Sequence, residues 1–131
     1  MKKTAPPPQA CPCGSNLAYA RCCEPLHQGQ PAPTAEALMR ARYSAYVLKL
    51  HDYVQATWHA STRPADVGEG DADATRWLGL EVKRHEQPDA THAIVEFVAR
   101  YRVAGRGHRL HETSRFVHEN GHWYYVDGDI G

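Results

Sequence analysis

The chain has 131 residues, of which 42% are hydrophobic and 23% charged, a composition typical of one globular domain with a short appendage. Fifteen Lys and Arg balance fifteen Asp and Glu, so no overall basic charge favours binding to nucleic acid or to an anionic membrane. The longest apolar stretch, Ala93 to Ala99, is interrupted by Glu96 and is far shorter than the roughly 20 residues of a membrane-spanning helix. Three prolines at positions 6–8 stand where a signal peptide would be apolar. We therefore expect a cytoplasmic protein.

The most informative segment is residues 11–27. All the cysteines lie in one stretch of 13 residues inside this segment, and the 108 residues that follow the last cysteine contain none. They are Cys11, Cys13, Cys22 and Cys23. A disulfide framework would distribute cysteines over the fold, whereas four thiols in one short segment are typical of a tetrahedral Zn²⁺ site with a structural role. His27 is an alternative fourth ligand if Cys23 points away.

Glycine and serine follow the first cysteine pair. Gly14 lets the backbone turn sharply, and Ser15 is the predicted N-cap of a short helix that carries Tyr19 inward and delivers the second pair. Residues 1–10 contain mainly Lys, Pro and small side chains, and we interpret them as a mobile tail.

A helical region follows the cysteines. Two prolines and a glycine make residues 28–33 a connector, and Thr34 is a good N-cap for a helix that runs to about Leu50. Asp52 is the predicted cap of a second helix that continues through Trp58.

Residues 65–78 carry a weaker pattern. Two glycines and four acidic residues between positions 66 and 73 predict an acidic loop. A short helical turn over residues 74–78 would bury Trp77.

The hydrophobic period then changes from that of a helix to that of a strand. Leu80 and Val82 alternate with polar residues, and a long strand is predicted for residues 91–103. Residues 105–107 turn the chain into a third strand, and Asn120-Gly121 is a strong hairpin signal before a fourth. Helices followed by a hairpin-connected antiparallel sheet predict an α+β fold, with the helices covering one face of the sheet.

The cysteine segment, Cys11-Pro12-Cys13-Gly14-Ser15 with Tyr19 and Cys22-Cys23, resembles the SEC-C motif. That motif is a small zinc module found at the C-terminal tail of the SecA translocation ATPase. The resemblance implies Zn²⁺ bound by the four cysteines.

Five later segments are familiar together: Thr34–Tyr46, Thr57–His59, Ser61–Pro64, Leu110–Phe116 and Trp123–Gly128. With the SEC-C segment they make the chain similar to the YchJ family of bacterial proteins. This resemblance implies a nuclear transport factor 2-like (cystatin-like) domain over residues 34–131, preceded by a tail and zinc module over residues 1–33. It supplies a fold but no activity.

Domains of this fold enclose a conical cavity that unrelated proteins use for catalysis, ligand binding or dimerisation. The polar candidates for the cavity are Arg42, Tyr46, His59, Arg63, Glu96, His111, Glu112 and Arg115. On a strand His111 and Arg115 share one face, whereas Glu112 and Ser114 share the other. The alternative is that His111 and Arg115 face solvent, or that Arg115 pairs with Glu96. Similarly, the aromatic residues could stack on a planar ligand or simply fill the core: Trp58, Trp77, Trp123, Tyr124 and Tyr125.

Two classes of function follow. The first is a binding or adaptor protein, since the SEC-C module of SecA binds the SecB chaperone and contacts ribosomes. The second is a small-molecule-binding protein or an enzyme that uses the cavity. The sequence has no phosphate-binding glycine loop, nucleophile elbow or catalytic metal triad, so it favours a binding protein over an enzyme and leaves an enzyme as the alternative. A homodimer is also compatible with this fold.

Overall fold

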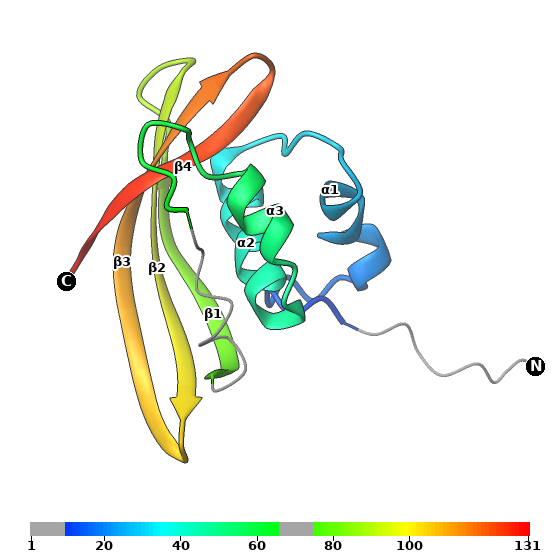
Figure 1. The fold of residues 1–131 in the computed structure, drawn as a ribbon, viewed down its shortest axis with the longest axis vertical. Helices are drawn as coiled ribbons and strands as arrows, with labels where there is room; N and C mark the ends of the chain where they lie inside the picture. Colours follow the sequence, from blue (N-terminus) through cyan, green and yellow to red (C-terminus); the bar gives the residue numbers. More distant parts are fainter. Residues whose placement is uncertain (1–9, 66–74) are drawn as a thin grey trace, which may run out of the picture.

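The structure is a computed structural model that describes residues 10–65 and 75–131. Its elements are a 3₁₀ turn η1 (Tyr19–Arg21), the helices α1 (Glu24–His27), α2 (Ala35–Leu48) and α3 (His51–Ala56), and the strands β1 (Thr75–Glu86), β2 (His92–Val103), β3 (Arg106–Glu119) and β4 (His122–Ile130). The sheet curves along one side of α2 and α3, and α1 lies on the other side (Figure 1). This arrangement confirms the predicted α+β fold.

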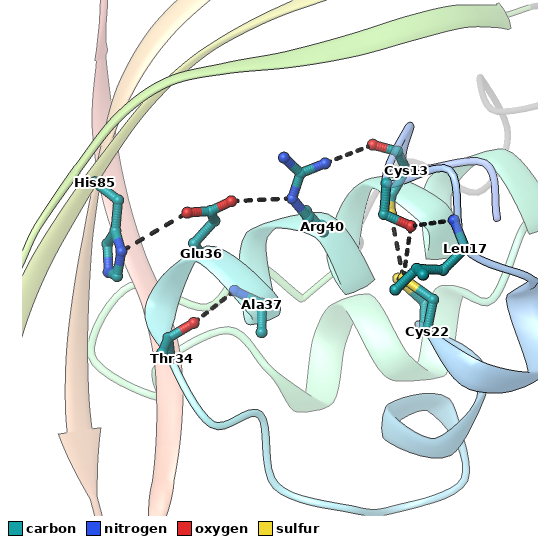
Figure 2. Close-up of polar contacts among 10 residues, drawn as sticks. Cys13, Leu17, Cys22, Thr34, Glu36, Ala37, Arg40 and His85 are labelled. Carbon is teal, nitrogen blue, oxygen red and sulfur yellow. Dashed lines mark hydrogen bonds and ion pairs between the residues drawn. The ribbon is translucent and has the colours of Figure 1, made fainter.

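Helix α2 lies at the centre of the molecule. Its N-cap is Thr34, as predicted, and the Thr34 hydroxyl accepts a 3.0 Å hydrogen bond from the backbone N–H of Ala37 (Figure 2). The helix ends at Leu48, earlier than predicted, because Lys49 adopts the left-handed conformation at the C-cap. Most of the helix is buried, which allows it to contact the sheet, α3 and the cysteine segment at once.

Replacing Thr34 with alanine should lower the free energy of unfolding by about 1 kcal/mol, because the first turn of α2 loses its side-chain acceptor. Urea unfolding followed by circular dichroism measures the change. Thr34→Ser keeps the hydroxyl and should unfold at nearly the wild-type midpoint. Equal losses in both variants would show that the cap does not stabilise α2.

The four strands form an antiparallel sheet in the order β1-β2-β3-β4. The β3–β4 turn is Asn120-Gly121, with positive φ at both residues, as a two-residue hairpin requires. Ala104 and Gly105 make the same kind of turn between β2 and β3, one residue before the predicted position. Alternation along β2 buries its residues at positions 93, 95, 97 and 99 against the helices.

Two local predictions are wrong. Residues 75–78 belong to β1 rather than to a helical turn, because Thr75 and Trp77 pair with Val103 and Tyr101 of β2, and a long strand ladder overrides local propensity. Helix α3 begins at His51 with Leu50 as its N-cap and stops at Ala56, so it does not reach Trp58. The predicted tail over residues 1–10 and the predicted acidic loop fall largely on residues 1–9 and 66–74, which lie outside the described residues. The last residue of the predicted tail, Ala10, is described and forms an antiparallel bridge with Ala18.

One buried cluster joins all parts of the fold. It contains Leu38 and Met39 of α2, Val95 of β2 and Phe116 of β3, and it also contains three cysteines. The cysteine segment is therefore packed into the core rather than attached to its surface. Among the residues that the structure describes, none of the helices has the length and apolar character needed to cross a membrane.

Candidate metal centre and core cavity

The four cysteine sulfurs converge at one point beside α2. All of them lie within 4.8 Å of one another, and Cys22 Sγ is 3.5 Å from Cys13 Sγ and 3.9 Å from Cys23 Sγ. A Zn–S distance of about 2.3 Å in a tetrahedron places sulfurs about 3.8 Å apart. The donor set and its spacing therefore fit a tetrahedral metal ion. Cys11, Cys13 and Cys23 are buried and Cys22 is partly exposed, so little room remains for a water ligand.

Backbone turns aim the cysteines at this point. Gly14 has a φ of +82°, and a Cβ at this position would lie only 3.2 Å from the carbonyl oxygen of Leu80. Ser15 does not cap a helix as predicted, since the N-cap of η1 is Ala18 without a side-chain bond. Instead the Ser15 hydroxyl accepts from the N–H of Leu17 and lies 3.1 Å from Cys22 Sγ. The serine thus stabilises the turn between the two cysteine pairs.

The pKa values of the cysteine thiols shift in opposite directions. A hydrogen bond from Cys23, helped by Ser15, lowers the pKa of Cys13 to about 4. The same contact with Cys13, together with burial, raises the pKa of Cys23, and burial raises that of Cys22. The lowered pKa of Cys13 favours its thiolate form, which is the form that binds a metal.

His27 lies away from the sulfurs. Its Nε2 is 2.8 Å from the carbonyl oxygen of Ala41, which can only accept, so this nitrogen carries the proton. Its Nδ1 then accepts from the Tyr19 hydroxyl at 2.6 Å. With both ring nitrogens engaged, His27 ties α1 to α2, and the structure brings Cys23, not His27, to the other three cysteines.

Helix α2 contributes polar side chains that contact the cysteines and that the sequence did not predict as part of the site. Arg40 Nη1 donates to the carbonyl oxygen of Cys13 at 2.9 Å, and its Nε donates to Glu36, which lies 3.8 Å from His85 Nδ1 (Figure 2). The hydroxyl of Ser44 is 3.4 Å from the sulfurs of both Cys11 and Cys23. The only sequence signal is the spacing of four residues between Arg40 and Ser44, which places them on one helix face.

In protein loaded with Zn²⁺, replacing Arg40 with methionine should accelerate metal loss to a competing chelator by about 10-fold or more, because outer contacts hold the first ligands in place. The rate is measured with a colorimetric zinc indicator. Arg21→Met is the matched control, since Arg21 is exposed on the same segment and should leave the rate unchanged. Equal rates for both variants would contradict a role for the Arg40–Cys13 contact.

A second feature is a cavity of about 330 Å³ between the helices and the concave face of the sheet. Three of the predicted cavity residues line it, Arg42 and Tyr46 of α2 and Glu112 of β3, and Ser114 of β3 lies beside Glu112. Most of the remaining wall is aromatic or aliphatic: Met39, Tyr43, Trp58, Trp77, Phe97, Ala99, Leu110, Phe116 and Tyr125. Apolar walls with a few convergent polar groups are typical of small-molecule sites.

Arg42 is the buried cation of the cavity, only 5% exposed. Its Nη1 donates to the carbonyl oxygen of Val54 and to the Thr57 hydroxyl, both at 2.8 Å. Its guanidinium carbon lies 5.1 Å from the Trp58 ring centroid and 4.6 Å from that of Tyr125, which are cation–π distances. Burial lowers the pKa of Arg42 from its ordinary value.

Glu112 is the acidic group of the cavity. Its Oε2 accepts from the Ser114 hydroxyl at 2.6 Å and from the Tyr125 hydroxyl at 3.0 Å. Gly128 of β4 lies directly beneath, and a Cβ at this position would overlap the Glu112 carboxylate. The carboxylate is therefore held in one place by two donors and by the absence of a side chain at Gly128.

The other predicted cavity residues do not line this cavity. His59 pairs with Glu119, and Arg63 donates to the carbonyl oxygen of Trp58. Glu96 and His111 face away from the helices and pair with each other at 2.7 Å. Arg115 shares that outer face and pairs with Asp127 and Asp129, not with Glu96. Strand alternation explains the placement, because Phe97 and Phe116 face inward and their sequence neighbours must face outward.

The fold and the site together define a nuclear transport factor 2-like domain with an N-terminal cysteine-rich SEC-C motif. The family model described as the YchJ middle NTF2-like domain matches residues 34–128, and the SEC-C motif matches residues 8–25. The chain belongs to the YchJ family.

Relatives and solved structures agree with this assignment. A UPF0225 protein of Ralstonia nicotianae is 62% identical over 95% of this chain and 93% of its own length. A UPF0225 protein of Bordetella parapertussis is 56% identical over 99% of both chains. The solution structure of a SEC-C motif containing protein from Rhodopseudomonas palustris has a TM-score of 0.84 and 35% identity, over 93% of this chain and 98% of that one. A crystal structure from Psychrobacter arcticus, also of a SEC-C motif containing protein, has a TM-score of 0.80 and 34% identity, over 94% of this chain and 83% of that one.

Proposed function

We propose that the protein is a zinc-stabilised, small-molecule-binding protein. The cysteines would hold Zn²⁺ through Cys11, Cys13, Cys22 and Cys23, where the ion supplies a structural cross-link. Four thiolate ligands leave no open coordination position, and soft sulfur donors favour zinc over magnesium or calcium. Elemental mass spectrometry on untagged protein purified without added metal should give about one zinc per chain. Protein that is free of metal and has four reactive thiols would contradict this half of the proposal.

The cavity is the proposed ligand site. The observation that carries this proposal is the placement of a buried guanidinium, Arg42, and a carboxylate, Glu112, on one apolar cavity without an ion pair between them among the described residues. Charges that merely stabilised the fold would gain most by pairing with each other, because burial of an unpaired charge is costly. Charges held apart around open space are instead available to a ligand.

Protein-observed NMR tests the cavity directly. A library of single-ring fragments should shift the resonances of residues that line the cavity, such as Tyr46 and Leu110, and leave the outer face of the sheet unchanged. Leu110→Trp should fill the cavity and abolish the shifts. Fragments that bind equally well to this variant, or only elsewhere on the protein, would contradict the proposal.

A protein partner for the SEC-C segment is a second candidate, favoured by one observation. Leu17 lies between the cysteine pairs and is 53% exposed, which presents an apolar side chain beside the metal centre. By analogy with the SecA tail, a SecB-type chaperone and the ribosome are the partners to test. Co-sedimentation with ribosomes and calorimetry with the chaperone should show binding that Leu17→Ser abolishes and Leu48→Ser, an exposed leucine on α2, retains. Absence of binding to both would exclude this candidate.

A further inference from the structure

We propose that the outer face of the sheet binds a single strand of nucleic acid through its phosphates, at the end of the sheet next to the β2–β3 turn. This surface is separate from the metal centre and the cavity, which lie on the helix side of the sheet. Its cationic side chains are four exposed arginines, defined here as the arginine patch: Arg76, Arg100, Arg102 and Arg109.

Strand pairing places the four arginines side by side. Arg102 of β2 lies directly opposite Arg76 of β1, and Arg100 of β2 lies directly opposite Arg109 of β3. Opposed Cβ atoms are about 5 Å apart, and alternate residues of a strand are about 7 Å apart, so the patch is about 10 Å across. The arginines must face outward, because residues beside them in the sequence line the cavity on the other face: Trp77, Ala99 and Leu110.

The arginine patch lacks acidic partners. Among the described residues none of its members forms an ion pair, whereas Arg84 and Arg115 on the same face are both paired with carboxylates. The acid in the next row of the ladder, Glu81, pairs with Lys83 at 3.0 Å, and this hydrogen bond, helped by the positive charge of the patch, lowers the pKa of Glu81. Like charges that lie directly opposite each other destabilise a sheet. The opposed arginines therefore cost stability in the free protein and are available to an external anion.

Phosphates are the anions that this patch fits best. A guanidinium donates two parallel N–H bonds to a phosphate and can also stack on a base. The two rows contain only arginine and glycine, since Gly79 and Gly107 occupy their remaining positions. Protein interfaces instead have cores that are depleted in charged residues, whereas Leu78, exposed at the bulge of β1, adjoins four cations. The patch therefore favours nucleic acid over an acidic protein.

The shape of the face favours a single strand. The sheet curves around α2 and α3, so its outer face is convex (Figure 1). A flexible strand can follow a convex surface, whereas a duplex is stiff over this length. The balanced total charge of the chain argues against nucleic acid for the molecule as a whole, but it does not describe this local excess. With three or four phosphate contacts, the logarithm of the binding constant should fall with the logarithm of salt concentration with a slope of about −2 to −3.

Fluorescence anisotropy on the full chain tests the proposal. The probes are a labelled RNA of about 16 nucleotides, the DNA of the same sequence, and the corresponding duplex. Single-stranded RNA and DNA should bind with similar affinity, because phosphate contacts do not involve the 2′-hydroxyl. Both should bind more tightly than the duplex.

Paired substitutions assign the binding to the patch. Arg100→Gln with Arg109→Gln should weaken binding by about 10-fold or more and reduce the salt slope by about 1.4. Arg84→Gln with Arg115→Gln removes the same charge from the same face and should bind within about 2-fold of the wild type at 0.1 M salt, because distant charges are screened. Leu17→Ser should bind as the wild type does, which separates this surface from the cysteine segment. The Arg100 and Arg109 variant loses like-charge repulsion and should unfold at or above the wild-type urea midpoint, so weaker binding would not reflect unfolding.

Four results would overturn the proposal. Equal losses of affinity in the two double variants would show that the arginine patch is not the site. Polyglutamate that displaces the oligonucleotide at equal concentration would identify an acidic protein as the partner, and tighter binding of the duplex would exclude a single strand. No binding of any of the nucleic acids at about 50 mM salt, where phosphate contacts are strong, would exclude the surface and leave the zinc site and the cavity standing.

Discussion

Replacing Cys13 with serine should abolish zinc binding and lower the free energy of unfolding by about 4 kcal/mol or more, the range reached when a structural metal is lost. Cys13 is 0% exposed and lies within 4.8 Å of the other three sulfurs, so a serine hydroxyl at this position neither replaces a soft ligand nor fills the volume. Zinc content per chain and urea unfolding of the purified variant measure the two effects.

Two controls make the Cys13 result specific. Wild-type protein stripped with a chelator should unfold at a midpoint close to that of Cys13→Ser, because both lack the ion. Ser15→Ala, which removes a neighbouring hydroxyl but no ligand, should keep the metal. A Cys13→Ser protein that retained one zinc per chain would contradict the four-cysteine site.

Replacing Phe116 with alanine should lower the free energy of unfolding by about 3–5 kcal/mol, the usual result when a buried aromatic side chain is removed from a packed core. Phe116 is among the most completely buried side chains of the protein and packs edge-to-face against Tyr125, with 5.7 Å between ring centroids. Guanidinium unfolding monitored by tryptophan fluorescence measures the loss.

Val117→Ala is the control for this prediction, because Val117 is the next residue on β3, faces the other way and is half-buried. It should cost about 1 kcal/mol. If Phe116→Ala lowered the free energy of unfolding by no more than Val117→Ala does, the aromatic wall of the cavity would not contribute to the stability of the core. The Phe116 variant also enlarges the cavity, so it should weaken the binding of a single-ring ligand.

Local patterns in the sequence predicted the cysteine cluster, the cap at Thr34 and the hairpin at Asn120-Gly121. Each depends on residues that are close in the chain: a dense group of thiols, one hydroxyl before a helix, and a dipeptide that tolerates positive φ. Such signals need no knowledge of the partner strand. They identify the α+β fold and the candidate metal ligands.

The composition of the cavity depended on pairing between distant strands and could not be read from residue type. His111 and Glu112 are neighbours in sequence and equally polar, yet only Glu112 faces the helices. Alternation predicted that the two residues lie on opposite faces, but the inward face is fixed by the burial of Phe116 and the register of β3 against β2. The prediction of a helical turn around Trp77 was wrong for the same reason, because β1 forms only by pairing with β2.

The packing of three cysteines into the same buried cluster as α2 and β2 bears on the cooperativity of the protein. A zinc module tethered to a surface could dissociate its metal and unravel while its host remained intact. Here the sulfurs touch Ser44 at the middle of α2, and Arg42, two residues earlier on that helix, faces the cavity. Release of the ion and melting of the sheet should consequently occur as a single transition, with metal release and tryptophan fluorescence following the same curve.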